Sequence, residues 1–123
     1  MKIRISIGDL SVDAELNETP TAREIANALP IKSPFNTWGE EIYFAIPVEA
    51  DLDESAKEVV ALGDLGYWPT GKAFCIFFGQ TPMSTPEKIV PASAVNIIGR
   101  VVGDATRFKK VMHEREVVVD AAP

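Results

Sequence analysis

Cysteine and histidine are scarce in this sequence, which has only Cys75 and His113 among its 123 residues. A single cysteine cannot form an internal disulfide, so nothing in the chain requires an oxidising compartment. A structural zinc site needs several cysteines or histidines at short spacing, and His113 has no such neighbour. Cys75 lies within the apolar run AFCIFF and is expected to pack as a small apolar residue. The sequence therefore predicts no metal site and no cofactor, and His113 is expected at the surface.

Long apolar runs and a surplus of basic residues are also missing. No stretch approaches the roughly 18 uninterrupted apolar residues of a membrane-spanning helix. The first residues, MKIRISIG, alternate polar with apolar instead of forming the apolar block of a secretion signal. The formal net charge of −6 argues against nucleic acid, which prefers a basic surface. We expect a cytoplasmic protein without a membrane or nucleic-acid partner.

The usual nucleotide and hydrolase motifs are absent as well. The chain contains no phosphate-binding loop, no GxGxxG fingerprint and no GxSxG elbow. Four carboxylates crowd residues 49–57, EADLDESAK, but their spacing lacks the glycine and the terminal glutamate of a calcium loop. This segment is expected to be a solvated connection.

Strict alternation of polar and apolar residues is the clearest pattern that the chain does contain. It runs from residue 3 to residue 16 and is interrupted only at Gly8-Asp9. Such alternation predicts a hairpin with one buried face and one solvated face. Gly8 suits the first central position of a II′ turn, which requires a positive φ.

Residues 19–29 change to the period of a helix. Their apolar residues fall at i, i+3, i+4 and i+7, and Pro30 ends the pattern. Two starts are equally good: a capping box of Thr21 with Glu24, or Thr19 followed by Pro20. The helix is short, so packing against a sheet must stabilise it.

The most apolar stretch is residues 58–79, EVVALGDLGYWPTGKAFCIFFG. Two short runs, 59–62 and 73–78, are rich in β-branched or aromatic residues and predict strands that are buried on both faces. Between them, Pro69-Thr70-Gly71 predicts a turn. We interpret this stretch as a central hairpin.

The last third of the chain continues the β pattern. Residues 80–91 contain three prolines and are expected to form a loop, whereas 95–102 and 116–119 are expected to be strands. Between these strands, Asp104 is a good N-cap for a short second helix. The sequence therefore predicts a single domain, 1–123, that is mostly β with two short helices.

Residues 35–48, FNTWGEEIYFAIPV, raise the question of a buried carboxylate. In one continuous strand, Glu40 would share the apolar face of Trp38 and Ile42, while Glu41 would share the other face with Tyr43. Burying a carboxylate without partners would raise its pKa. A bulge at Gly39 would instead turn Glu40 outward, and this alternative is favoured.

Three spans carry a resemblance to a known family: NTWGEEIYF, GDLGYWPTGKAFCIFFG and ASAVNIIGRVVGDATRFKKV. Together they resemble a small family of uncharacterised prokaryotic proteins with a cyclophilin-like fold. The resemblance covers nearly the whole chain. It implies a closed, eight-stranded antiparallel barrel whose open ends are capped by helices, in agreement with the pattern of strands and short helices.

The same resemblance argues against the usual cyclophilin activity. Cyclophilins twist a proline peptide bond with an arginine on the strand that leads into a glycine–aromatic segment. The matching stretch, residues 35–39, contains no arginine, and Glu40, Glu41 and Tyr43 follow it. Where cyclophilins carry a histidine ahead of the late strand, this chain has Val95 or its neighbours. A carboxylate cannot replace the arginine, because its field has the opposite sign.

In cyclophilins the ligand groove lies on the outside of the barrel, which implies a set of candidate ligand-binding residues here. Trp38 has two interpretations, since it can join this set or fill the barrel with Phe74, Ile76 and Phe78. The candidates are Thr37, Trp38, Glu41, Tyr43, Tyr67, Trp68, Phe77 and Met83, with Cys75 on the same outward face.

Three functions remain open at this point. The first is the binding of a small molecule or short peptide in an aromatic, acidic groove. The second is an enzyme that acts on an amide or lactam, or a residual peptidyl-prolyl isomerase, with Glu40 or Glu41 as general acid or base. Cyclophilin-like domains also occur in oxoprolinase and allophanate-type enzymes, which handle such groups. The third is a homo-oligomer whose interface surrounds Trp68.

Overall fold

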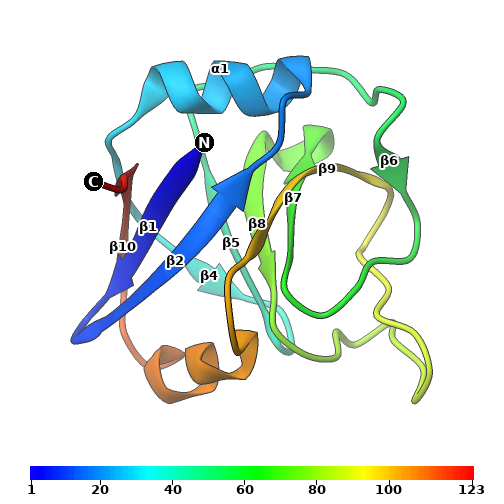
Figure 1. Cartoon of the computed structure of the whole chain (residues 1–123). Coiled ribbons are helices and arrows are strands. Elements are labelled where there is room, and N and C mark those ends of the chain that lie inside the picture. The colour runs from blue at the N-terminus through cyan, green and yellow to red at the C-terminus, as the bar shows by residue number, and fades with distance from the viewer.

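The computed structural model describes all residues from 1 to 123 and consists mainly of β-strands (Figure 1). The helical segments are α1 (Pro20–Ala28) and two 3₁₀ helices, η1 (Pro69–Gly71) and η2 (Ala105–Val111). The strands are β1 (Lys2–Ile7), β2 (Leu10–Leu16), β3 (Ile31–Pro34), β4 (Asn36–Thr37), β5 (Glu41–Ala45), β6 (Ala56–Lys57), β7 (Asp64–Trp68), β8 (Ala73–Phe77), β9 (Val95–Val101) and β10 (Glu116–Ala121).

The strands form one antiparallel sheet that curls into a nearly closed barrel. Nine of them are hydrogen-bonded in the order β3-β10-β1-β2-β9-β7-β8-β5-β4, and β6 pairs with β9. The end strands β3 and β4 are not paired, so the barrel has an unsealed seam. The expected closed, eight-stranded barrel is therefore confirmed only in part. At the seam, Pro34 has no N–H to offer, and the Phe35 N–H donates to the Arg115 carbonyl at 3.0 Å.

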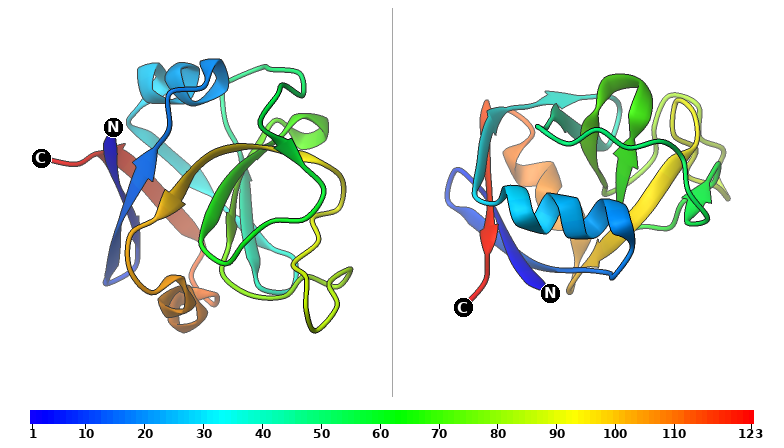
Figure 2. Two further views of the ribbon diagram at one scale, coloured as in Figure 1. Left: turned by 45° about the vertical axis from the view of Figure 1, so that its right-hand side comes forward. Right: turned by 90° about the horizontal axis from the view of Figure 1, so that it is seen from above.

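The helices lie over the two ends of the barrel. Figures 1 and 2 show α1 across one end and the orange turns of η2 at the opposite end. Helix α1 starts at Thr19, whose hydroxyl accepts the N–H of Ala22 at 3.3 Å, with Pro20 as its first residue. The Thr19–Pro20 start is thus confirmed over the alternative capping box. Asp104 caps η2 as predicted and accepts the N–H of Thr106 at 2.9 Å.

The N-terminal hairpin also follows its prediction. Strands β1 and β2 pair through Ile7 and Leu10, and Gly8 between them has a φ of +56°. The inward residues of this hairpin have essentially no exposed surface, and they belong to the main core of the barrel. Aromatic rings fill the other side of this core, where Phe44 stacks on Phe74 with ring centres 5.1 Å apart.

The central hairpin begins later than the sequence pattern predicts. Residues 59–62 do not form a strand, and β7 starts at Asp64. The Asp64 carboxylate accepts the Ala61 N–H at 2.8 Å, and the Asp64 N–H donates to the Ala61 carbonyl, so the chain turns there. Leu62 is exposed, and only Val60 is buried, through a single bridge to Ile89. An apolar run such as 59–62 does not predict a strand reliably when an aspartate that can close a turn follows it.

A second, smaller core lies on the outside of the barrel. It comprises Val60, Ala73, Cys75, Phe77 and Val95, all buried. Strand β8 therefore contributes to both cores, which explains why every residue from 73 to 77 is buried. Val60, from the connection before β7, and Ile89, from the loop of residues 78–94, pack on this face. The outer face of β8 is therefore shielded from solvent, unlike the outside of an ordinary barrel.

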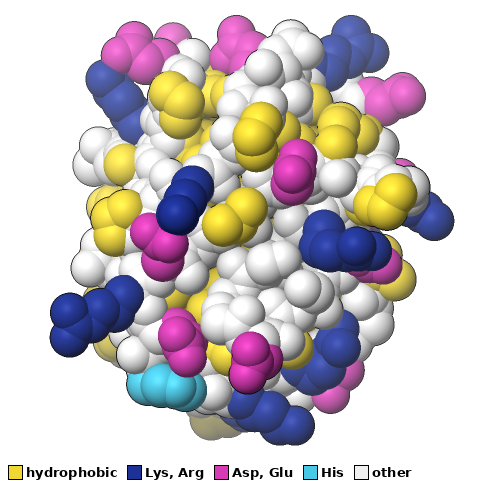
Figure 3. Space-filling model, turned by 90° about the vertical axis from the view of Figure 1, so that its left-hand side faces the viewer, with side chains coloured by type: hydrophobic (Ala, Val, Ile, Leu, Met, Phe, Trp, Pro, Cys, Tyr) yellow, Lys and Arg dark blue, Asp and Glu magenta, His cyan; other side chains and the backbone are white.

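No helix of the structure is long and apolar enough to cross a bilayer. On the face seen in Figure 3, side chains of both charge signs are interspersed with hydrophobic ones. His113 is exposed as predicted and lies 3.2 Å from the Glu114 carboxylate.

Gly99 offers a test of this architecture. It lies on β9, the strand between β2 of the N-terminal hairpin and β7 of the central one. It pairs with Leu16 across β2 and β9, and a Cβ added there would overlap the Glu15 carbonyl oxygen. We predict that Gly99→Ala lowers the free energy of unfolding by about 2–3 kcal/mol in urea denaturation, because the strands must separate.

Gly103→Ala is the matched control, because no atom lies within 4 Å of its added Cβ. Only the positive φ of +88° opposes that substitution, with an expected cost of about 1 kcal/mol. Equal losses in the two variants would contradict the close approach of β2 and β9.

Candidate functional site

A two-residue turn determines which of two adjacent glutamates faces the outer core. The Trp38 N–H donates to the Glu41 carbonyl at 2.9 Å, and the Glu41 N–H donates to the Trp38 carbonyl at 3.2 Å. Gly39 and Glu40 therefore form the two-residue loop. Gly39 has a φ of +59°, as the first position of a II′-type turn requires. The single strand expected over residues 35–48 is therefore two strands, β4 and β5. The irregularity predicted at Gly39 is a hairpin turn instead of a bulge.

Glu40 consequently points away from the barrel. Its side chain is about one-third exposed, and its Oε2 lies 3.3 Å from Nζ of Lys109 on η2. An ion-paired carboxylate at the surface lacks the burial that would adapt it to proton transfer. Glu40 is thus removed as a candidate general acid or base.

Glu41, by contrast, is buried, with only 6% of its surface exposed. It pairs with Phe77 in the register of β5 and β8, and its side chain points outward from the barrel, as expected. No lysine, arginine or histidine forms an ion pair with it. The residue is buried despite facing outward because the loop that precedes β9 covers this side of the sheet.

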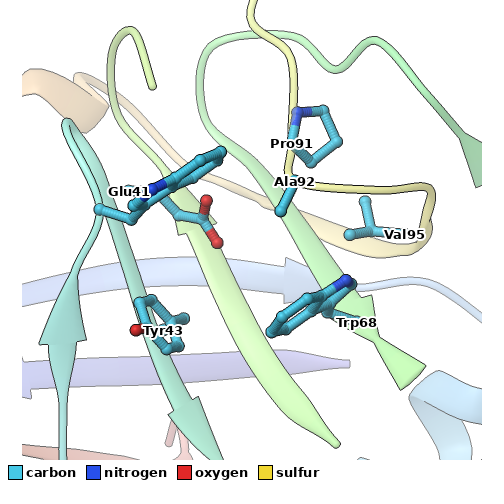
Figure 4. A pocket seen from close by; sticks show the side chains of 7 residues that line it. Glu41, Tyr43, Trp68, Pro91, Ala92 and Val95 are labelled. Atoms are coloured by element: carbon cyan, nitrogen blue, oxygen red, sulfur yellow. The ribbon is translucent and has the colours of Figure 1, made fainter. Parts of the chain in front are cut away.

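The carboxylate of Glu41 enters a pocket of about 210 Å³. Figure 4 shows the carboxylate pointing toward the centre of the space between Tyr43 and Trp68 on one side and Pro91 and Ala92 on the other. Strands β5 and β7 and the segment leading into β9 thus supply the walls. The seven lining residues are Trp38, Glu41, Tyr43, Trp68, Pro91, Ala92 and Val95.

Trp68 is held in place from two directions. Its indole N–H donates to the Ser93 hydroxyl at 2.7 Å. Its ring also lies against Gly71, where an added Cβ would come within 2.8 Å of two indole carbons. The half-buried indole therefore links the turn after β7 to the loop before β9, and it forms a fixed wall of the pocket.

The floor beneath the pocket is apolar. Cys75 and Phe77 lie in the outer core, with Tyr43 and Trp68 packed against it. Burial, reinforced by the nearby Glu41 carboxylate, raises the pKa of the Cys75 thiol well above its ordinary value. Cys75 is therefore a packed thiol and not a nucleophile, as the sequence predicted.

The electrostatic consequence for Glu41 is large. Burial raises the pKa of this carboxyl from 4.5 to about 7, and a side-chain hydrogen bond with Cys75 opposes the shift. Desolvation dominates because no positive charge compensates it. Near neutral pH, Glu41 therefore exchanges between a hydrogen-bond donor and a buried anion.

The pocket brings together four of the eight residues predicted for ligand binding. These are Trp38, Glu41, Tyr43 and Trp68. Thr37 and Met83 are exposed outside the pocket, and Phe77 lies in the outer core. Trp38 does not fill the barrel, which settles its two interpretations in favour of the outer face.

Tyr67 is the clearest correction among the predicted site residues. It was expected on the surface beside Trp68, but it has no exposed surface and belongs to the main core. Its hydroxyl donates to the Val48 carbonyl at 2.6 Å and accepts the Ala50 N–H at 3.3 Å. Adjacent strand residues point to opposite faces, so Tyr67 and Trp68 could not both line the pocket.

Three lining residues, Pro91, Ala92 and Val95, were not on the predicted list. Pro91 and Ala92 follow a loop whose path is not encoded in any local periodicity. The resemblance did single out Val95, as the counterpart of a cyclophilin histidine, and this signal could have placed it at the groove.

A comparison with protein-family models agrees with the fold, since a model described as Cyclophilin-like matches residues 1–120. The chain belongs to the cyclophilin-like family. The family resemblance deduced from the three sequence spans is thereby confirmed.

Two solved structures illustrate the relationship within this fold. The hypothetical protein AF2241 from Archaeoglobus fulgidus, an archaeal protein, is 49% identical over 99% of this chain and 95% of its own, with a TM-score of 0.82. McbB in complex with tryptophan is 16% identical over 97% of this chain and 44% of its own, with a TM-score of 0.70. No curated protein matches the chain. The second likeness concerns the cyclophilin-like fold alone.

The raised pKa of Glu41 makes a testable prediction about stability. Between pH 4.5 and 7 the folded protein retains a proton that the unfolded chain loses, so the free energy of unfolding falls as the pH rises. At 1.36 kcal/mol per pKa unit, the contribution lost is about 3 kcal/mol. We predict that Glu41→Gln removes this part of the pH dependence in urea denaturation.

Glu40→Gln is the control for that experiment, because it makes the same substitution at the adjacent, ion-paired residue. It should retain the slope between pH 4.5 and 7. If Glu41→Gln and the unsubstituted protein lose stability in parallel over this range, then Glu41 titrates normally and the assigned burial is wrong.

Proposed function

We propose that this cyclophilin-like protein binds a small molecule in the pocket around Glu41. The observation that carries the proposal is a buried carboxyl, without an ionic partner, that points into an aromatic pocket. Proteins rarely bury such a group unless a ligand or a reaction uses it. A concave apolar site with a few converging polar groups is the usual form of a small-molecule site.

The dimensions of the pocket limit the ligand. Its volume of about 210 Å³ lies below the roughly 300–1,000 Å³ of sites for drug-sized molecules. A single ring with a short substituent fits this space, and a peptide could insert only one side chain. McbB, a distant relative in fold, was solved in complex with tryptophan, and this supports a small ligand with an aromatic body.

Both tryptophans of the chain line the pocket, which provides a direct binding test. We predict that single-ring probes, namely 2-phenylethylamine, 2-phenylethanol and benzamide, include at least one that shifts both indole N–H signals in ¹H–¹⁵N NMR spectra. Tyr43→Ala should weaken its binding about tenfold, because it removes one aromatic wall.

Thr37→Ala serves as the control, since Thr37 lies on the neighbouring strand but outside the pocket. It should leave the affinity unchanged. The proposal fails if no probe shifts the indole signals, or if the shifts map to another face of the barrel.

An enzyme that acts on an amide or lactam is the second candidate. The pKa of Glu41 near 7 favours it, because a general acid or base works best when its pKa is close to the operating pH. Hydrolysis of 2-pyrrolidinone to 4-aminobutyrate, followed by NMR, is a suitable test. Turnover that disappears in Glu41→Gln would favour this candidate over binding alone.

Prolyl isomerisation is not expected in this protein, because no arginine is among the residues that line the pocket. We predict that a proline-peptide assay at high protein concentration shows no acceleration above the uncatalysed rate. Acceleration above the uncatalysed rate would contradict this prediction. Its loss in Glu41→Gln would assign the catalysis to the Glu41 carboxyl instead of an arginine.

A homo-oligomer with its interface around Trp68 remains a prediction. The Trp68 indole is half-buried and hydrogen-bonded within its own chain. None of the large hydrophobic side chains that are exposed lines the pocket with Trp68: Met1, Leu52, Val59, Leu62, Met83 and Val102.

A further inference from the structure

The formal charge that the pocket can carry is negative. Glu41 is its single carboxyl, and no lysine, arginine or histidine is among the residues that line it. The Trp68 indole N–H is already engaged by Ser93, so apart from protonated Glu41 itself the remaining donors are the Trp38 indole N–H and the Tyr43 hydroxyl. An anionic ligand would lack a cationic partner and would lie beside a carboxyl group. The pocket therefore selects against carboxylates and phosphates.

A metal ion does not fit the same site. No group of three or more histidines, cysteines, aspartates or glutamates could hold one in this chain. Calcium takes six to eight oxygen ligands and magnesium needs near-octahedral coordination. One carboxyl group among aromatic and aliphatic side chains supplies too few. A positive charge that enters this pocket must belong to an organic group that brings its own apolar surface.

The aromatic walls suit such a group. Trp38, Tyr43 and Trp68 line the pocket that the Glu41 carboxylate enters. Ring faces attract cations at close range, and tryptophan does so most strongly. The net charge of −6 adds a weak attraction for cations over the whole molecule.

We propose that the ligand of this pocket is an organic cation, a primary or secondary ammonium group on a compact apolar or aromatic body, with its charge against Glu41. The proposal rests on the proposed function and names its ligand class. The ammonium donates to the carboxylate at the centre of the pocket, while the apolar body contacts Pro91, Ala92 and Val95.

Cation binding must then be coupled to proton release from Glu41. The titratable group that interacts with it is the Cys75 thiol from β8, and the other titratable residue that lines the pocket is Tyr43 on its own strand. Strand β7 and the segment before β9 present only Trp68, Pro91, Ala92 and Val95. Because none of these residues is positive, the incoming ammonium is the one charge that stabilises the carboxylate. Affinity for an ammonium should therefore rise with pH up to about 7 and then level off.

Three probes of similar shape test the ligand class: 2-phenylethylamine, 2-phenylethanol and 3-phenylpropionate. Calorimetry and the indole N–H signals of the whole protein report binding. We expect the amine to bind at least tenfold more tightly than the alcohol at pH 8, and the carboxylate to bind most weakly. The amine affinity should fall about tenfold per pH unit below pH 6, with a proton released on binding.

Two glutamate variants separate the role of the charge from the role of the fold. Glu41→Gln should reduce the amine affinity at least tenfold at pH 8, remove the pH dependence and change the 2-phenylethanol affinity much less than the amine affinity. Glu40→Gln, the adjacent surface substitution, should leave all three affinities as they are. The alcohol also confirms that each variant still folds with an intact pocket.

The possible outcomes distinguish the inference from the function beneath it. Equal binding of amine and alcohol, without dependence on Glu41, overturns the cation assignment but leaves a small-molecule site. Tightest binding of 3-phenylpropionate overturns the assignment in the same way. If none of the three probes shifts the indole signals, the cation assignment and the proposed function both fail.

Discussion

The register between β5 and β8 is the constraint on which the site depends. Trp38 and Glu41 are hydrogen-bonded to each other on either side of the Gly39–Glu40 turn, so β5 begins at Glu41 and this residue pairs with Phe77. A slip of one residue would exchange the faces of the two glutamates and place Glu41 in the barrel interior. The turn itself is fixed by its surroundings, since a Cβ on Gly39 would press against the backbone of the 80–81 loop. One glycine thus decides which carboxyl enters the pocket and which pairs with Lys109.

The covering of the outer face follows from the same part of the fold. A second core forms on the outside of β8, and the loop before β9 closes over it, with Trp68 hydrogen-bonded to Ser93 at its edge. The barrel thereby acquires a partly enclosed, largely apolar site on a surface that would otherwise be solvated. Burying a carboxyl there opposes folding near neutral pH, which is the cost expected of a group retained for binding or chemistry and not for stability. A ligand that supplies a positive charge would relieve this cost.

Much of this arrangement can be predicted from the sequence, because alternation and capping are local signals. The hairpin on either side of Gly8, the Thr19 cap, the Asp104 cap and the strand at residues 95–101 follow from such signals. The start of β7 does not, because the apolar run before it ends in a turn closed by Asp64. Periodicity also fails for loops that pack over a sheet, so the contributions of Pro91 and Ala92 to the pocket were not predictable.

The role of the two glutamates required the three-dimensional structure. Sequence reasoning found the acidic, aromatic character of the strand and the irregularity at Gly39, but it considered burial for Glu40 instead of Glu41. Whether an outward-facing side chain is buried depends on what covers it, and the covering residues Pro91 and Ala92 lie about fifty positions further along the chain, in the loop before β9. The most direct test of the account is a ¹³C NMR titration of the Glu41 side-chain carboxyl. The account predicts a pKa of about 7, whereas an ordinary value near 4.5 would contradict it.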